Sequence, residues 1–269
     1  MRQVTDAFTS QHADLERPAA HADRLRLFCL PHAGGNTVRF SAWSRWLPQQ
    51  VEVVPVDLPG HGRRLRESLL TAWPPLVDDV ARIVGEQAEG AYAVFGHSLG
   101  ALLGYEICRA LQYRGRPPAL LVAAARNGPS AGLSHRPIHG LPDAEFLCRL
   151  RHLGGTPDGV LDQPDLLEMF LPVLRADMRL AELYERAPGP PLYCPIAAFA
   201  GRHDKMTDDA GMRAWKRETT QTLELAFIDG RHFFLEKPEF TEALAARLGR
   251  LRVAGRAGSV RSGQRQDTD

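Results

Sequence analysis

Short apolar runs alternate with stretches of helical spacing along most of the chain. The runs are short enough for single buried strands and fall at residues 25–30, 51–57, 92–95, 119–125, 196–200 and 223–228. Between them, apolar residues recur every three or four positions, as Val80, Ile83 and Val84 do within residues 76–87. Strands that alternate with helices are typical of a mainly parallel sheet covered by helices on both faces. The pattern therefore predicts an α/β fold.

The alternation stops between residues 135 and 191. This segment reads as mostly helical and is interrupted by prolines and glycines. It is too long and too apolar for a linker, so its apolar faces must cover another part of the protein. We expect residues 135–191 to form a helical lid over the carboxyl edge of the sheet.

The two ends of the chain are polar. Residues 1–23 are expected to be a flexible lead-in and residues 253–269 a disordered tail, because neither carries the apolar periodicity of a packed element. The predicted division is thus one folded domain over residues 24–252, flanked by these two segments.

Composition narrows the class of protein. A length of 269 residues suits one large α/β domain, and a formal net charge of +1 excludes a strongly basic nucleic-acid-binding protein. No apolar stretch approaches the roughly 20 residues of a membrane-spanning helix, and the polar start does not resemble a signal peptide. The four cysteines are scattered without a C-x-x-C pair, which favours buried free thiols over disulfides or zinc. We expect a cytoplasmic protein that binds neither nucleic acid nor membrane.

A serine stands where the third strand passes into a helix. The G-x-S-x-G sequence at residues 96–100 follows an apolar run and precedes an alanine- and leucine-rich segment. Outer glycines let such a turn close tightly and present the serine at the carboxyl end of a sheet. Ser98 is therefore a candidate nucleophile. His97 is not expected to be its base, because its side chain should leave the turn in a different direction.

The partners of the serine follow from their order in the chain. A serine nucleophile needs a histidine base and an acid, and in this arrangement they come in the order serine, acid, histidine. Asp204 follows the fifth predicted strand and His232 follows the sixth, and His232 is the last histidine of the chain. Asp208, Asp209 and Asp229 are rival acids. The first two lie near a helix start, where capping is the alternative role, and Asp229 is expected to shape the turn before His232.

The reaction also needs N–H groups that stabilise the oxyanion. One comes from the residue after the nucleophile, here Leu99, and the second from the loop after the first strand. In that loop, residues 32–35, we choose Ala33. An ordinary tight turn is the alternative interpretation of the loop by itself. The ordered set of residues predicts a hydrolase or acyl transferase.

These residues resemble those of type II thioesterases, free-standing editing enzymes of polyketide and nonribosomal peptide synthesis. The resemblance spans residues 25–251 and rests on Phe40, Trp43 and the motifs PHAGG at 31–35, PGHGRR at 59–64, GHSLG at 96–100, GRHD at 201–204 and GRHFF at 230–234. It implies an α/β-hydrolase fold with a helical lid and the same triad and oxyanion donors. Two departures are Arg231, where the family usually has glycine, and residues 126–129, which follow the family's serine-glycine-arginine run only loosely.

The resemblance also implies a substrate and a partner. The substrate would be an acyl thioester on the phosphopantetheine arm of an acyl or peptidyl carrier protein, hydrolysed without a metal or bound cofactor. Carrier domains are commonly acidic, so Arg63, Arg64 and Arg66 are candidate docking residues, with solvated loop charges as the equal alternative.

Other functions fit the same residues. A medium-chain fatty acyl thioesterase or a general carboxylesterase would use the same scaffold, and so would a thioesterase domain cut from the end of a megasynthase. A non-catalytic hydrolase-like protein would use the covered pocket only to hold a ligand. The preferred acyl chain does not follow from the pattern.

Overall fold

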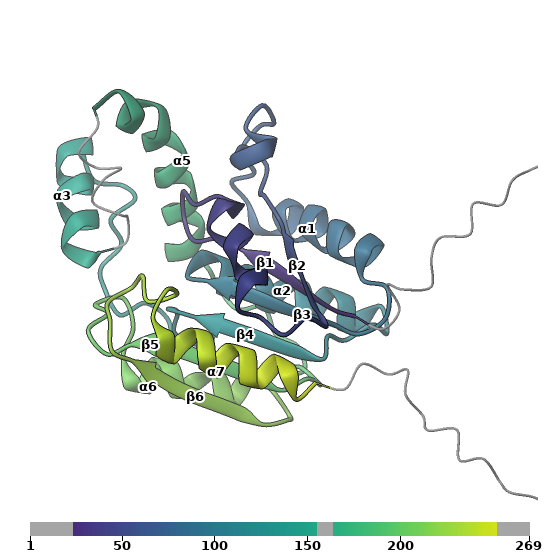
Figure 1. The fold of residues 1–269 in the computed structure, drawn as a ribbon. Helices are drawn as coiled ribbons and strands as arrows, with labels where there is room; N and C mark the ends of the chain where they lie inside the picture. The colour runs from purple at the N-terminus through teal and green to yellow at the C-terminus, as the bar shows by residue number, and fades with distance from the viewer. Residues whose placement is uncertain (1–23, 155–163, 252–269) are drawn as a thin grey trace, which may run out of the picture.

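The structure is a computed structural model that describes residues 24–154 and 164–251 (Figure 1). The predicted lead-in, residues 1–23, and tail, residues 253–269, lie outside the described residues. A sheet of six parallel strands in the order β2-β1-β3-β4-β5-β6 forms the centre. The strands are β1 Leu25–Leu30, β2 Val51–Pro55, β3 Tyr92–His97, β4 Leu120–Ala124, β5 Ile196–Gly201 and β6 Leu223–Ile228.

The order of the strands places the serine turn at the middle of the sheet. The chain goes from β1 outward to β2 and then returns to add β3 on the other side of β1. Such a reversal leaves a crevice outside the carboxyl ends of the two strands, where ligands of open α/β sheets bind. Leu30, the last residue of β1, pairs in register with Gly96 at the end of β3. The loop after β1 and the serine turn after β3 are therefore neighbours.

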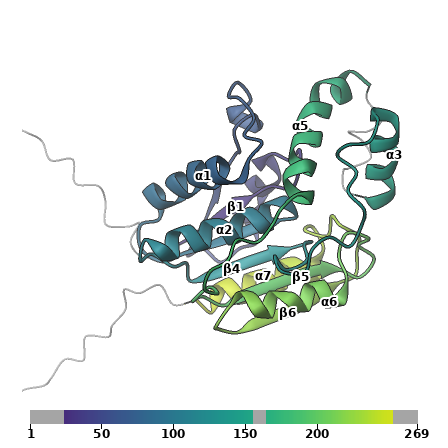
Figure 2. The ribbon, with the colours of Figure 1, turned by 180° about the vertical axis from the view of Figure 1, so that it is seen from behind.

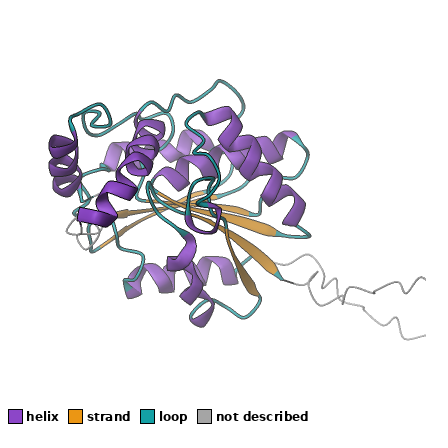
Figure 3. Cartoon of the chain, turned by 90° about the horizontal axis from the view of Figure 1, so that it is seen from above, coloured by secondary structure: helices purple, strands orange, loops and turns teal. Residues whose placement is uncertain are grey.

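Helices cover both faces of the sheet (Figure 3). Successive strand side chains point to opposite faces, so Phe28 and Leu30 join the core beneath α1 and α2, and Leu27 joins the core beneath η2 and α7. The α-helices are α1 Trp73–Gln87, α2 Leu99–Tyr113, α3 Asp143–Leu153, α5 Pro164–Glu182, α6 Asp209–Arg213 and α7 Pro238–Gly249, and the 3-10 helices are η2 Thr37–Arg45, η3 Gly62–Arg64 and η4 Ala214–Glu218. The mainly parallel α/β fold is confirmed.

The helices α3 and α5 belong to the long connection between β4 and β5, and they stand together at one end of the sheet (Figures 1 and 2). The C-terminal end of α5 is fastened to the core through its backbone. Trp73 donates to the carbonyl of Leu180 at 3.0 Å, and Arg126 donates to that of Ala181 at 2.9 Å. The predicted helical insertion is thus present and packs on the body of the domain through the end of α5.

One prediction about the cysteines is wrong. All four are free thiols, and Cys29, Cys108 and Cys194 are buried as expected, but Cys148 is exposed. It lies on α3, which buries Phe146 and Leu150 on its other side. Among residues 24–154 and 164–251, no helix combines the length and the apolarity that crossing a membrane requires.

Candidate active site

The two glycines of the serine turn are required by close backbone contacts. A Cβ atom on Gly96 would lie 2.0 Å from the carbonyl oxygen of Gly100. A Cβ on Gly100 would lie 2.5 Å from the carbonyl oxygens of Leu30 and Pro31. Ser98 itself has φ 56° and ψ −112°, a strained conformation for a residue with a side chain. The start of α2 is thereby pressed against the end of β1, which brings Leu99 to the loop that contains Ala33.

His232 and Asp204 meet in the structure. The Nδ1 atom of His232 lies 2.9 Å from Oδ2 of Asp204, and the other oxygen of Asp204 accepts from the N–H of Met206 at 2.9 Å. Both side chains are buried. A carboxylate at Nδ1 holds the proton on that nitrogen and leaves Nε2 as an acceptor, which is what a base for a serine hydroxyl needs.

The rival acids have other partners. Asp208 caps α6 by accepting the N–H of Gly211 at 2.7 Å. Asp209 pairs with an arginine on the same helix, and Asp229 pairs with His203, with all these side chains exposed. Asp204 is therefore the acid that reaches His232.

His97 links the strand of the serine to the loop of the base. Its Nε2 donates to the main-chain carbonyl of His232 at 2.9 Å, and its ring is fully buried. Burial, and then the neighbouring His232 and His32, lower the pKa of His97 well below its usual value, so it stays neutral. Within the described residues no hydrogen bond joins the Ser98 hydroxyl to His232. Such contacts often tighten only when substrate binds.

Two N–H groups of the loop after β1 have acceptors in the described residues. Gly35 donates to the carbonyl of His32 at 2.8 Å, and Gly34 donates to the carboxylate of Asp177 at 2.7 Å. The N–H of Ala33 has no partner among the described residues. Leu99 is the first residue of α2, so its N–H has no acceptor within the helix. Neither of the two N–H groups chosen from the sequence therefore has an acceptor in the part of the chain that the structure describes.

Two further residues, to which the sequence assigned no role, pack at the loop that contains Ala33. Asp177 lies on α5, and its Oδ2 accepts from Nε2 of His61 at 2.8 Å, while Nδ1 of His61 lies 3.0 Å from the carbonyl of Pro59. Burial alone lowers the pKa of His61, but the hydrogen bond and charge of Asp177 outweigh it and raise that pKa above its usual value. The PGHGRR motif pointed to His61, but no pattern singled out Asp177.

Two of the three arginines considered for docking form ion pairs within the protein. Arg64 pairs with Glu67 and Asp79, each at 2.6 Å. Arg63 contacts a buried aspartate at 3.3 Å, although its own side chain is 80% exposed. Arg66 is exposed. Arg64 is thus a structural residue of this loop.

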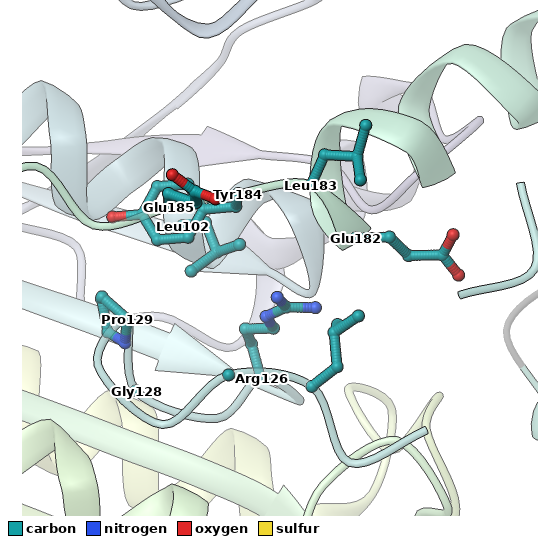
Figure 4. A pocket seen from close by; sticks show the side chains of 10 residues that line it. Leu102, Arg126, Gly128, Pro129, Glu182, Leu183, Tyr184 and Glu185 are labelled. Atoms are coloured by element: carbon teal, nitrogen blue, oxygen red, sulfur yellow. The ribbon is translucent and has the colours of Figure 1, made fainter. Parts of the chain in front are cut away.

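A pocket of about 480 Å³ lies between α2, the loop after β4 and the end of α5 (Figure 4). It is lined by Leu102, one helical turn after Ser98, and by the buried Arg126, whose pKa burial lowers to about 10. Neither Ser98 nor its proposed partners line this pocket.

The sequence matches a known family over the whole described domain. The model of the "Thioesterase domain" family matches residues 25–251. The gramicidin S biosynthesis protein GrsT of Aneurinibacillus migulanus is 34% identical over 220 residues, which are 81% of this chain and 86% of that protein. Thioesterase PikA5 of Streptomyces venezuelae is 37% identical over 213 residues, 78% of this chain and 75% of that protein. A rat protein, the medium-chain S-acyl fatty acid synthase thioesterase of Rattus norvegicus, is 28% identical over 221 residues, 80% of this chain and 83% of its own.

Solved structures agree with this match. The RedJ thioesterase from the prodiginine biosynthetic pathway of Streptomyces coelicolor has a TM-score of 0.77 and 36% identity, covering 93% of this chain and 97% of that one. The type II thioesterase BorB from the borrelidin biosynthetic cluster has a TM-score of 0.76 and 33% identity, covering 84% and 93%. The chain therefore belongs to the thioesterase domain family and is an enzyme that hydrolyses thioesters.

Proposed function

We propose that this thioesterase removes acyl groups from the phosphopantetheine arm of acyl or peptidyl carrier proteins in polyketide or nonribosomal peptide synthesis. The observation that carries the catalytic part is the 2.9 Å contact between His232 and Asp204 at the carboxyl edge of the sheet that also presents Ser98. The proposal that the substrate is bound to a carrier protein rests on the similarity of this chain to GrsT, PikA5 and BorB.

The first half of the reaction transfers the acyl group to the enzyme. Oγ of Ser98 attacks the thioester carbonyl carbon while its proton passes to Nε2 of His232. The tetrahedral oxyanion is stabilised by the N–H groups of Ala33 and Leu99, and Asp204 stabilises the imidazolium. The carbon–sulfur bond then breaks, and the thiolate leaves with the proton held by His232.

The second half releases the acid. A water molecule loses its proton to His232 and attacks the acyl-serine carbonyl carbon through a second oxyanion. The bond to Oγ breaks, and Ser98 recovers its proton from His232. Backbone donors stabilise the charge in both halves, so we propose that the reaction uses no metal or bound cofactor.

The compartment that fits this role is the cytoplasm. Carrier-bound acyl chains are intracellular intermediates, and the free thiols of Cys29, Cys108, Cys148 and Cys194 are compatible with a reducing environment.

A second candidate is release of medium-chain fatty acids, favoured by the similarity to the rat fatty acid synthase thioesterase. The two functions differ in the acyl chain and the carrier rather than in the triad. Assays with acyl groups of different length on one carrier protein separate them.

The test compares three substrates that carry the same acyl group: a carrier protein loaded with it, its CoA thioester and its p-nitrophenyl ester. We expect the highest kcat/KM for the carrier-bound thioester and no turnover of any substrate by Ser98→Ala. A higher kcat/KM for the simple ester would contradict the carrier assignment. Turnover by Ser98→Ala would contradict the nucleophile.

A further inference from the structure

One carboxylate joins the helical insertion to the loop that contains Ala33. Asp177 lies on α5, and its Oδ2 accepts two hydrogen bonds, from the N–H of Gly34 at 2.7 Å and from Nε2 of His61 at 2.8 Å. Its side chain is 4% exposed. A buried carboxylate with two donors on one oxygen is held in a single orientation, because moving it would leave both donors unpaired.

The same helix packs directly on Gly34. Gly34 has φ +68°, and a Cβ atom there would lie 2.3 Å from Cδ2 of Leu174, one turn before Asp177. A side chain at this position would be strained by the positive φ and would require Leu174 of α5 to shift. The conformation of the loop therefore depends on the position of α5, through one hydrogen bond and one close packing contact.

The hydrogen bond acts on the peptide group next to the proposed oxyanion donor. Fixing the N–H of Gly34 fixes the peptide plane that follows Ala33. It also takes the Gly34 N–H away from the substrate, whereas the N–H of Ala33 has no acceptor among the described residues. Donors of an oxyanion hole are effective because they are held in place before the reaction.

We propose that Asp177 is a positioning residue for thioester hydrolysis: it holds the oxyanion loop in its active conformation when α5 is seated on Gly34. This inference rests on the proposed function, since it takes Ala33 as an oxyanion donor. His61 donates to the same oxygen of Asp177 as Gly34 does, and its own ring is fixed by the carbonyl of Pro59 at 3.0 Å.

The test compares Asp177→Ala and Asp177→Asn in the full chain, with a short acyl-CoA as substrate. The alanine variant removes the acceptor and is expected to lower kcat roughly 10- to 100-fold, with KM within about threefold of wild type, because the lost interaction acts on the transition state. The asparagine variant keeps an oxygen that can accept both N–H groups. Its kcat is expected to stay within about fivefold of wild type.

Glu182 provides the matched control. It is a buried acid on the same helix, but it accepts from the N–H groups of Ile138 and His139 and does not contact the oxyanion loop. Glu182→Ala is expected to lower the melting temperature while kcat stays within about threefold. Equal losses of kcat in Glu182→Ala and Asp177→Ala, or a change in KM alone for Asp177→Ala, would overturn the proposal.

Hydrogen exchange tests the same contact without a variant. In the wild-type protein the amide of Gly34 is expected to be protected and to open together with the amides of α5, and rapid exchange at Gly34 would overturn the proposal. If Asp177→Ala does not fold, hydrogen exchange and the kinetics of Asp177→Asn still test the proposal.

The proposed function and the positioning role of Asp177 can be refuted separately. Turnover by Ser98→Ala refutes the proposed function, whereas an inactive Ser98→Ala with wild-type kcat in Asp177→Ala refutes this inference alone.

Discussion

The imidazole of His97 donates from Nε2 to the main-chain carbonyl of His232 at 2.9 Å. His97 is the last residue of β3, directly before the proposed nucleophile, and its ring is fully buried. The strand that ends in the serine turn thus also holds the backbone of the residue that carries the proposed base. This hydrogen bond and the contact of His232 with Asp204 together fix the proposed base relative to the proposed nucleophile.

Replacing His97 should therefore affect catalysis as well as stability. His97→Phe keeps a ring but leaves the carbonyl of His232 without a donor, which should lower the free energy of unfolding by about 1–3 kcal/mol. We expect kcat to fall about tenfold because the base is misplaced. His97→Gln retains an N–H near the position of Nε2. It should recover most of the lost free energy of unfolding and most of the lost kcat. Urea unfolding and steady-state kinetics measure the two effects, and a His97→Phe enzyme with wild-type kcat would show that the bond is not needed for alignment.

Acid should destabilise the fold through His32 and His97, which are neutral in the folded protein. Burial, then the charge of Arg39, lowers the pKa of His32 to about 3, and burial lowers that of His97 well below its usual value of 6.5. Below that value the unfolded chain binds more protons than the folded one. The free energy of unfolding should thus decrease as the pH falls toward 3, by up to about 1.4 kcal/mol per pH unit for each histidine.

His61 works in the opposite direction. Its pKa is raised in the folded protein, so its stabilising effect is present below pH 6.5 and is lost as the pH rises through the folded-state pKa. Urea denaturation at several pH values between about 7 and 5 measures the net change in the free energy of unfolding that these opposing effects produce. His32→Gln should reduce the slope with pH and His61→Gln should increase it. Unchanged slopes in both variants would contradict the assigned protonation states.

The choice of Asp204 over Asp208 can be tested by a matched pair of substitutions. Asp204→Asn removes the charge at Nδ1 of His232 and favours the wrong tautomer, which should lower kcat by about 10³- to 10⁴-fold. Asp208→Asn changes only the cap of α6, where asparagine is about as good, so kcat should stay near wild type. Measuring kcat for both variants shows which aspartate is the acid. The reverse ranking would assign the acid to Asp208.

Two glycines on α2 should differ sharply in tolerance to alanine. A Cβ on Gly100 meets backbone oxygens of Leu30 and Pro31 at 2.5 Å, which cannot move without shifting β1. A Cβ on Gly104, one turn later, meets side-chain atoms at 3.2 Å and beyond, which can adjust. We expect Gly100→Ala to cost about 3 kcal/mol or more and Gly104→Ala about 1 kcal/mol or less. Thermal unfolding of the two variants measures this, and equal costs would contradict the close approach of α2 to β1.

Hydrophobic patterning was sufficient to predict the sheet. In the central strands of a parallel sheet both faces are buried, so β3, β4 and β5 appear in the sequence as continuous apolar runs such as residues 92–95. The order serine, acid, histidine then placed Ser98, Asp204 and His232 after β3, β5 and β6, because each directly follows its strand or is separated from it by a short turn.

Long-range polar contacts could not be predicted in the same way. Asp177 and Gly34 are 143 positions apart, and their hydrogen bond depends on how α5 packs on the body of the domain. Apolar periodicity predicts which face of α5 is buried but not what it meets. The exposure of Cys148 was also missed, because the direction of one side chain on α3 depends on that same packing.

The most direct measurement of the central claim is the intact mass of the enzyme, quenched rapidly after mixing with an acyl-loaded carrier protein. Wild-type enzyme should gain the mass of the acyl group, peptide mapping should place it on Ser98, and Ser98→Ala should show no adduct and no release of acid. Hydrolysis by wild type without any acyl-enzyme during turnover, together with hydrolysis by Ser98→Ala, would contradict the account.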